Sequence, residues 1–281
     1  MIDPKAFLGG KFASILDSRL SAAEIEFELE RHFSLNETLG FRSYISIAEC
    51  GEPLLPLTDP ELQFFSPHPY QSIGAPYGGA SPFALRSGAA ERLRSAQGRL
   101  SKLRPGFRLK VFDGYRPLEV QAFMVELTYS QIAVERGFDP GQMAAADQET
   151  VYSEVFKLFA RPNPDPDAPP PHSTGGAVDL TILDASGVPL EMGSAIDAMP
   201  PLALPHYFHG RTDPESKRIQ ANRDLLRDVM VDSGFERLPR EWWHFSYGDQ
   251  GWALIRCLKE RKQAAAIYGR VSGLPASSIS P

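Results

Sequence analysis

The sequence has few of the features typical of disulfide-stabilised, membrane-inserted or nucleic-acid-binding proteins. Its 281 residues include only two cysteines, Cys50 and Cys257. They form neither a disulfide framework nor a zinc-thiolate pattern, and we expect both to be buried thiols. The formal net charge of -6 argues against nucleic acid or an anionic membrane as a partner. Because the N-terminus lacks a basic region followed by an apolar core, and no later stretch could span a bilayer, we expect a cytoplasmic location.

Two short motifs hold the residue types of a hydrolytic zinc site. His172 and Asp179 are the ends of the run His-Ser-Thr-Gly-Gly-Ala-Val-Asp, and Glu241 and His244 lie in Glu-Trp-Trp-His-Phe. Catalytic zinc usually takes three protein ligands and leaves a fourth position for water, so His172, Asp179 and His244 are the candidate ligands. Glu241 is then a spare carboxylate that can act as the catalytic base.

Each motif alone has a plainer explanation. A buried His or Asp is often only a hydrogen-bonded core group, and the Trp242-Trp243 pair also fits a strand on a core. Gly175 and Gly176 favour the metal site, because glycine lets the backbone pass close to an ion, and Ala177 keeps that face small.

The alternation of residues 177–183 predicts a half-buried strand. One face carries Val178, Leu180 and Ile182, and the other carries Asp179, which therefore points away from the apolar side. His172 reaches the same cleft from the preceding loop. Residues three apart lie on opposite faces of a regular strand, so we expect Glu241 on a loop that enters a strand beginning near Trp242.

Arg116 occupies a predicted strand-to-helix corner in Asp113-Gly-Tyr-Arg-Pro117. One interpretation is an ion pair with Asp113 that braces the turn. The other is a fixed guanidinium that polarises the scissile carbonyl and stabilises the oxyanion of a tetrahedral intermediate. Both interpretations fit the sequence.

The distribution of apolar residues favours one α+β domain, with a small antiparallel sheet that carries the zinc site and helices packed on one face. At 42% hydrophobic and 23% charged residues, the chain can bury a sizeable core. The predicted helices are 21–39, 82–103, 117–136, 148–160 and 212–234, and the predicted strands are 41–48, 107–111, 177–183, 242–247, 252–258 and 264–268. Residues 161–171 contain six prolines and are predicted to be an extended connector that delivers His172.

His206 and His209 are the remaining histidines near a candidate cleft. They lack a neighbouring carboxylate that could serve as a base, so we do not expect them to bind the metal. We expect them to line the cleft mouth as part of a mobile lid.

Four motifs in register resemble those of the D-alanyl-D-alanine dipeptidases, zinc peptidases associated with vancomycin resistance and cell-wall dipeptide use. The resemblance covers roughly residues 44–271. The motifs are Phe112-Asp-Gly-Tyr-Arg-Pro117, His172-Ser-Thr-Gly-Gly-Ala-Val-Asp-Leu180, Met192-Gly-Ser-Ala-Ile-Asp197 and Glu241-Trp-Trp-His-Phe245.

This resemblance implies one zinc ion per chain, held by His172, Asp179 and His244. It also implies a catalytic base at Glu241 and an oxyanion-stabilising arginine at Arg116. By the same resemblance, Asp197 would hold the free ammonium of the dipeptide. An isolated Asp near Gly and Ser would more simply cap the segment after Gly193.

The chain departs from the family at two places. The family often has Ser two residues before the first zinc histidine, whereas this chain has Pro170, which puts substrate preference rather than catalysis in doubt. About forty residues are also added at the N-terminus. We therefore expect an N-terminal helical extension over residues 1–40 and a catalytic domain over 41–281.

The expected function is zinc-dependent hydrolysis of the small dipeptide D-alanyl-D-alanine. One alternative is a zinc D,D-carboxypeptidase or endopeptidase on peptidoglycan stem peptides, which the lack of a recognisable signal peptide disfavours. Another is a zinc-binding module without catalysis, which would need neither Glu241 nor Arg116.

Overall fold

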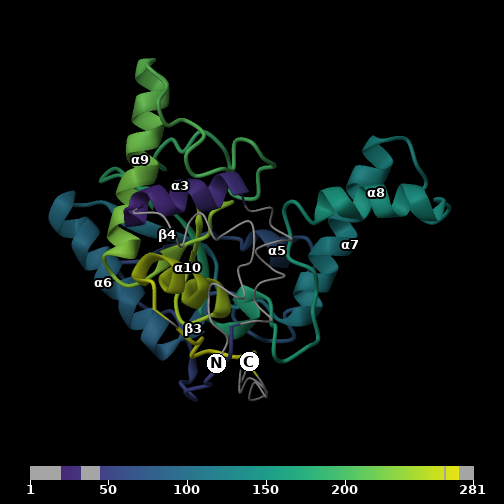
Figure 1. The fold of residues 1–281 in the computed structure, drawn as a ribbon, viewed down its shortest axis with the longest axis horizontal. Coiled ribbons are helices and arrows are strands. Elements are labelled where there is room, and N and C mark those ends of the chain that lie inside the picture. The colour runs from purple at the N-terminus through teal and green to yellow at the C-terminus, as the bar shows by residue number, and fades with distance from the viewer. Residues whose placement is uncertain (1–19, 33–44, 263, 272–281) are drawn as a thin grey trace.

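A five-stranded mixed sheet, in the order β2-β4-β5-β7-β6, supports the structure. The computed structural model describes residues 20–32, 45–262 and 264–271 (Figure 1). β2 runs parallel to β4, and the other neighbouring strands are antiparallel. The strands of this sheet are β2 (Gln63–Phe64), β4 (Arg108–Asp113), β5 (Ala177–Leu183), β6 (Glu236–Arg237) and β7 (His244–Ser246), and β1 (Leu54–Pro56) pairs separately with β3 (Ala84–Arg86).

Helices cover the sheet and extend from its side, so the predicted α+β class is confirmed. The α-helices are α3 (Ala22–His32), α5 (Pro69–Ser72), α6 (Ser87–Leu103), α7 (Leu118–Glu135), α8 (Ala145–Val155), α9 (Pro214–Val231) and α10 (Gln250–Glu260), and the 3-10 helix η2 is Pro171–Thr174. Val178, Leu180 and Ile182 of β5 share one core cluster with apolar residues of α6 and α9. Within the described residues, no helix is both long enough and apolar enough to cross a membrane.

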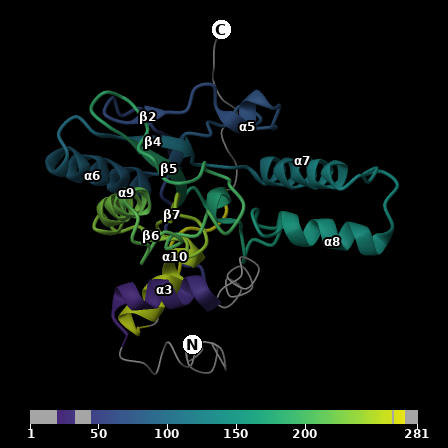
Figure 2. The same cartoon turned by 90° about the horizontal axis from the view of Figure 1, so that it is seen from above.

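Two helices form an arm beside the sheet. Figure 2 shows α7 and α8 running side by side away from the strands. Their mutual contact is a separate apolar cluster in which the rings of Tyr129 and Tyr152 stack at 4.4 Å between centroids. The base of this arm lines a pocket beside the sheet through Gln121, Leu158 and Phe159.

The N-terminal helix α3 packs against α10. Ile25 and Leu29 are each 1% exposed and share an apolar cluster with Leu254 and Leu258. Glu26 also pairs with Arg237 and Lys259, and although burial opposes its charge, these two cations hold the pKa of Glu26 below its ordinary value. Helix α3, in a region for which the sequence suggested no role, therefore buttresses β6 and α10.

Most predicted elements are confirmed, with shifted ends. β5 has the predicted bounds, and the helices predicted at 82–103, 117–136, 148–160 and 212–234 correspond to α6, α7, α8 and α9. The helix predicted over 21–39 is present as α3, and residues 33–39 lie outside the described residues. The expectation of a half-buried β5 is wrong: all seven residues are buried, because the second face lines a covered site.

The strand predicted over 252–258 is instead helix α10. Asp249 caps it by accepting a hydrogen bond from the Trp252 backbone N at 2.7 Å, and the buried residues recur at helical spacing. The β-favouring Trp252 and Ile255 suggested a strand, but the cap and the apolar face stabilise a helix. The strands predicted over 264–268 and 41–48 are reduced, among the described residues, to a single β-bridge between Ala266 and Ile47. Residues 41–44 of the second prediction lie outside the described part. Cys50 is exposed, contrary to expectation, and Cys257 is buried.

We expect Leu29→Ala to lower the free energy of unfolding by about 2 to 5 kcal/mol, because it leaves a cavity between α3 and α10. Urea unfolding measures this change. Arg31→Ala removes only an exposed pair with Glu28 on the same helix and should cost less than about 0.5 kcal/mol. Equal effects of the two substitutions would mean that α3 does not pack on α10 in solution.

Candidate metal centre

Three buried side chains from two strands and a 3-10 helix converge on one point. Asp179 of β5 lies directly opposite His244 of β7 in the antiparallel register, and His172 lies in η2. Asp179 approaches His244 Nδ1 at 2.9 Å and His172 Nε2 at 3.2 Å, and these two nitrogens lie 3.2 Å apart. The structure thus brings together all three predicted ligands.

The other nitrogen of His172 determines which atom faces this point. His172 Nδ1 lies 2.6 Å from the carbonyl oxygen of Gly114, which can only accept a hydrogen bond. Nδ1 therefore carries the proton, and in a neutral imidazole Nε2 presents its lone pair to the Asp179 carboxylate.

His244 is oriented by a chain of hydroxyl and carboxylate groups. The Ser246 hydroxyl donates its proton to Asp249 at 2.7 Å, so at 3.2 Å it can only accept from His244 Nε2. The lone pair of His244 Nδ1 consequently faces Asp179 and His172. The hydrogen-bonded chain of His244, Ser246 and Asp249 is buried throughout, and Asp249 is only 1% exposed.

Three acceptors so close together require a cation. A single proton can be shared by two of them, whereas a metal ion accepts lone pairs from His172, His244 and Asp179 at once. Ligand atoms about 2.0 to 2.2 Å from a tetrahedral zinc ion lie about 3.3 to 3.6 Å from one another, close to the separations between the ligand atoms here. Burial opposes the charge of Asp179, but His172 and His244 in their protonated form supply positive charge and hydrogen-bond donors that hold the pKa of Asp179 well below its ordinary value. A bound metal ion would replace those protons as the positive charge beside Asp179. The donor set fits zinc.

Glu241 lies in the hairpin between β6 and β7, on a loop as predicted. Its carboxylate is 3.8 Å from His244 Nδ1, and its side chain is only 12% exposed. Burial, together with the negative charges of Asp179 and Asp197, raises the pKa of Glu241 well above its ordinary value. Such a carboxylate, once ionised, is a strong proton acceptor.

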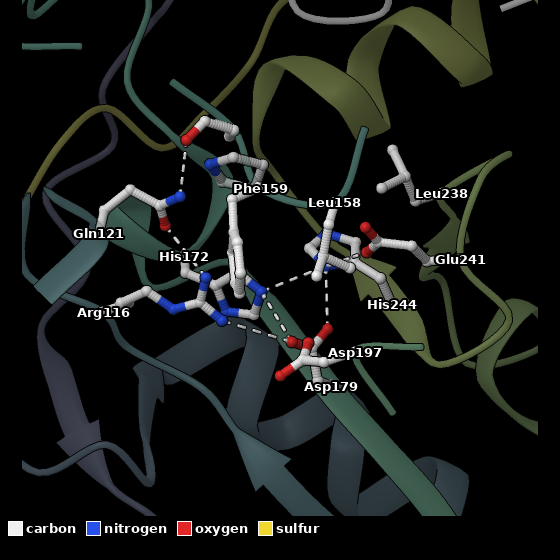
Figure 3. Close-up of a pocket in the computed structure, with 12 residues that line it drawn as sticks. Arg116, Gln121, Leu158, Phe159, His172, Asp179, Asp197, Leu238, Glu241 and His244 are labelled. Carbon is white, nitrogen blue, oxygen red and sulfur yellow. Dashed lines mark hydrogen bonds and ion pairs between the residues drawn. The ribbon is translucent and has the colours of Figure 1, made fainter. Parts of the chain in front are cut away.

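Arg116 both braces the turn and faces the pocket, so both interpretations of this residue hold. Its Nε donates to Asp113 at 2.8 Å, and its Nη1 donates to Gln121 of α7 at 3.0 Å. Its Nη2 is 3.6 Å from Asp179 and donates to the Tyr70 hydroxyl at 3.2 Å. Figure 3 shows Arg116 and Glu241 on opposite sides of the pocket.

Asp197 completes the charged lining of the pocket. Its carboxylate accepts the Tyr70 hydroxyl proton at 2.7 Å, and Asp197 has a left-handed backbone with φ of 65°. Burial of the carboxyl, and the nearby charge of Asp179, raise the pKa of Asp197 to about 6. The Gly193 backbone N is instead bound by Glu191, so Asp197 does not cap that segment.

The pocket is small and has an apolar wall (Figure 3). Leu158 and Phe159, just after α8, line it together with Leu238 and Pro171. The empty space is about 410 Å³ including the open mouth. Gln121 joins this wall to Arg116, because its amide nitrogen donates to the Ala160 carbonyl at 2.7 Å.

Two expectations about neighbouring residues need correction. A Cβ on Gly176 would lie 2.3 Å from the Tyr247 carbonyl oxygen, so this glycine permits close strand packing rather than approach to an ion. His206 does not line the pocket: it binds Glu30 of α3 at 2.7 Å and lies 3.3 Å from Arg237. His209 is exposed and is also absent from the pocket lining.

Sequence reasoning missed the residues that orient the site. Ser246 was detectable in principle, because it lies two residues after His244 and so shares its strand face. Tyr70 was not, because it comes from a Pro-rich stretch 127 residues away from Asp197. Gln121 had no signal beyond its place on the helix after Arg116.

Comparison with known proteins gives one consistent family. The family model described as D-ala-D-ala dipeptidase matches residues 64–263. A D-alanyl-D-alanine dipeptidase of Synechocystis sp. is 41% identical over 81% of this chain and 95% of its own length. Dipeptidases of the same name from Escherichia coli and Enterococcus faecium are 30% and 31% identical, over 50% and 52% of this chain and 55% and 64% of theirs. A solved LD-carboxypeptidase shares 18% identity and a TM-score of 0.41 over 79% of each chain, too little to support an argument.

We expect Ser246→Ala to weaken Zn²⁺ binding about 10- to 100-fold, because it removes the group that holds His244 in the binding tautomer. Competition with a chromogenic chelator measures the affinity. Ser233→Ala removes a buried serine that bonds only the Val229 carbonyl of α9, and it should bind Zn²⁺ normally. Unchanged affinity in Ser246→Ala would contradict the tautomer assignment.

Proposed function

Because the chain belongs to the D-alanyl-D-alanine dipeptidase family, we propose that it hydrolyses D-alanyl-D-alanine to two D-alanines with one zinc ion per chain. The observation that carries the proposal is the convergence of three acceptor groups, from His172, Asp179 and His244, beside Glu241. A core hydrogen-bond network would pair donors with acceptors instead.

Water attack on the peptide carbonyl requires a nucleophile at neutral pH. A zinc ion, when bound, supplies Lewis-acid chemistry that lowers the pKa of water and polarises the carbonyl. Glu241 takes a proton from the attacking water while the oxygen of that water bonds to the carbonyl carbon. When the C–N bond breaks, Glu241 returns that proton to the leaving nitrogen, so the carboxylate is regenerated.

Arg116 stabilises the negative charge that develops on the carbonyl oxygen. Burial disfavours its charge, but Tyr70, Asp113 and Asp179 outweigh this and raise the pKa of Arg116 further above its ordinary value. The guanidinium is therefore always charged and is held in place by partners on three sides. A preorganised cation of this kind needs no rearrangement during the reaction.

Asp197 supports a dipeptide substrate over a longer stem peptide. A free ammonium can form a charge-assisted hydrogen bond with its carboxylate, whereas an acylated nitrogen would leave that carboxylate unpaired. The pocket, with about 410 Å³ of empty space including its mouth and a wall of Leu158, Phe159 and Leu238, is of a size for a short substrate. Pro171, next to His172, lines the same wall, whereas Pro170, where the family often has a serine, is not among the lining residues.

A panel of substrates tests the proposal directly. The zinc-loaded protein should cleave D-Ala-D-Ala, and should cleave L-Ala-L-Ala and N-acetyl-D-Ala-D-Ala much more slowly. Rapid release of D-alanine from the N-acetylated compound or from peptidoglycan stem peptides would favour the carboxypeptidase alternative. No cleavage of any peptide by zinc-loaded protein would favour the zinc-binding module.

We expect Glu241→Ala to retain zinc and fold but to lose turnover by about 10²- to 10⁴-fold, because the general base is gone. Steady-state kcat, with elemental analysis of the same sample, measures both. Glu215→Ala, at an exposed glutamate in the first turn of α9, is the control and should have normal kcat. Near-normal turnover in Glu241→Ala would remove Glu241 from the mechanism.

We expect Asp197→Asn to reduce the preference for free over N-acetylated D-Ala-D-Ala by about tenfold or more, since an amide cannot form the ion pair with an ammonium. The ratio of the two kcat/KM values is the measurement. Asp232→Asn, at an exposed position after α9, should leave that ratio unchanged. If Asp197→Asn also leaves it unchanged, Asp197 does not bind the ammonium.

A further inference from the structure

Arg223 of α9 is a fully buried cation whose hydrogen bonds all go to backbone carbonyls. Its Nε donates to the Met192 carbonyl at 2.7 Å, its Nη1 to Leu204 and its Nη2 to Leu202, both at 2.8 Å. The side chain is 0% exposed. Across residues 20–32, 45–262 and 264–271, no carboxylate lies within ion-pair distance of it. A charge buried without a carboxylate needs such hydrogen bonds to be tolerated.

The three carbonyls lie on both sides of Asp197 in the chain. Met192 precedes the loop that carries Asp197, and Leu202 and Leu204 follow it. Within residues 193–201 the backbone makes one long hydrogen bond, of 3.4 Å from Ala198 N to the Ala195 carbonyl. The Ser194 hydroxyl also donates to the Leu202 carbonyl at 3.4 Å, and the Asp197 carboxylate accepts from Tyr70. Apart from the Tyr70 hydroxyl that donates to the Asp197 carboxylate, the contacts that hold this loop lie at or near its two ends.

The same side chain also joins this loop to the segment that carries Glu241. The guanidinium lies over the ring of Trp242, the residue after Glu241, at 5.4 Å. The backbone N–H of Trp242 donates to the Ala203 carbonyl at 3.0 Å, and its indole N–H donates to the Ser194 hydroxyl at 2.9 Å. One packed unit thus consists of Arg223, Trp242 and the two ends of the loop.

We propose that Arg223 is a positioning residue for substrate selectivity, which sets the place of the Asp197 carboxylate relative to Glu241. Arg223 does not line the pocket and so acts through the loop rather than on the substrate. The inference rests on the proposed function only in that Asp197 receives the substrate ammonium. Three donors in a planar fork are needed to hold three carbonyls, and lysine cannot reproduce that geometry.

The test is Arg223→Lys in the full-length, zinc-loaded protein, with Arg227→Lys as the matched control. Arg227 lies one turn further along α9 and pairs with Asp224 and Asp228 instead of backbone carbonyls. Kinetics are measured with free and N-acetylated D-Ala-D-Ala, and backbone hydrogen exchange is followed in residues 193–201 and 177–183. Elemental analysis and thermal unfolding verify zinc content and folding.

For Arg223→Lys we expect kcat/KM on D-Ala-D-Ala to fall about tenfold or more, mainly through a higher KM, while the rate on the N-acetylated compound is unchanged. Exchange should accelerate in residues 193–201 and stay slow in 177–183. Arg227→Lys should match the wild type. A lower melting temperature with an unchanged substrate ratio and a protected loop would make Arg223 a structural residue only and overturn the proposal.

Two further outcomes are distinguishable from these. If the wild type does not cleave D-Ala-D-Ala, the proposed function fails. Backbone hydrogen exchange of residues 193–201, compared between Arg223→Lys and the wild type, then decides by itself whether Arg223 holds the loop. If Arg223→Lys does not fold, Ser194→Ala tests the same unit by removing the acceptor of the Trp242 indole. A reduced substrate ratio in Ser194→Ala supports the proposal, and a wild-type ratio contradicts it.

Discussion

Two hydrogen bonds, made by His172 to Gly114 and by His244 to Ser246, direct the lone pairs of both imidazoles toward Asp179. The rest of the pocket depends on this arrangement. With both outer nitrogens protonated, the inner atoms form a set of acceptors that only a cation can satisfy. The surrounding fold keeps these side chains buried, and the Gly114 carbonyl and the Ser246 hydroxyl fix the orientation of the two rings.

Strand register brings the reacting groups together. Asp113, Asp179 and His244 occupy matched positions on three adjacent strands, β4, β5 and β7. Asp113 holds Arg116 on one side, and the hairpin before His244 carries Glu241 on the other. A one-residue slip in either strand pair would turn a ligand to the opposite face, which links the stability of the sheet to the chemistry of the pocket.

The sequence predicted the chemistry better than the surroundings. The ligands, Glu241 and Arg116 lie in short local motifs, and period-two alternation was enough to orient Asp179 on β5. Helix α10 was missed because its local preference for strand is overridden by the Asp249 cap and by packing. Tyr70 and Arg223 act over long sequence separations, through tertiary contacts that no local pattern encodes.

The most direct test of this account is the location of zinc in a crystal of the zinc-loaded protein, measured by anomalous scattering at the zinc edge. We expect one peak per chain, within about 2.2 Å of His172 Nε2, His244 Nδ1 and a carboxylate oxygen of Asp179. A peak elsewhere, or one bound through His172 Nδ1, would contradict the tautomers on which the site depends.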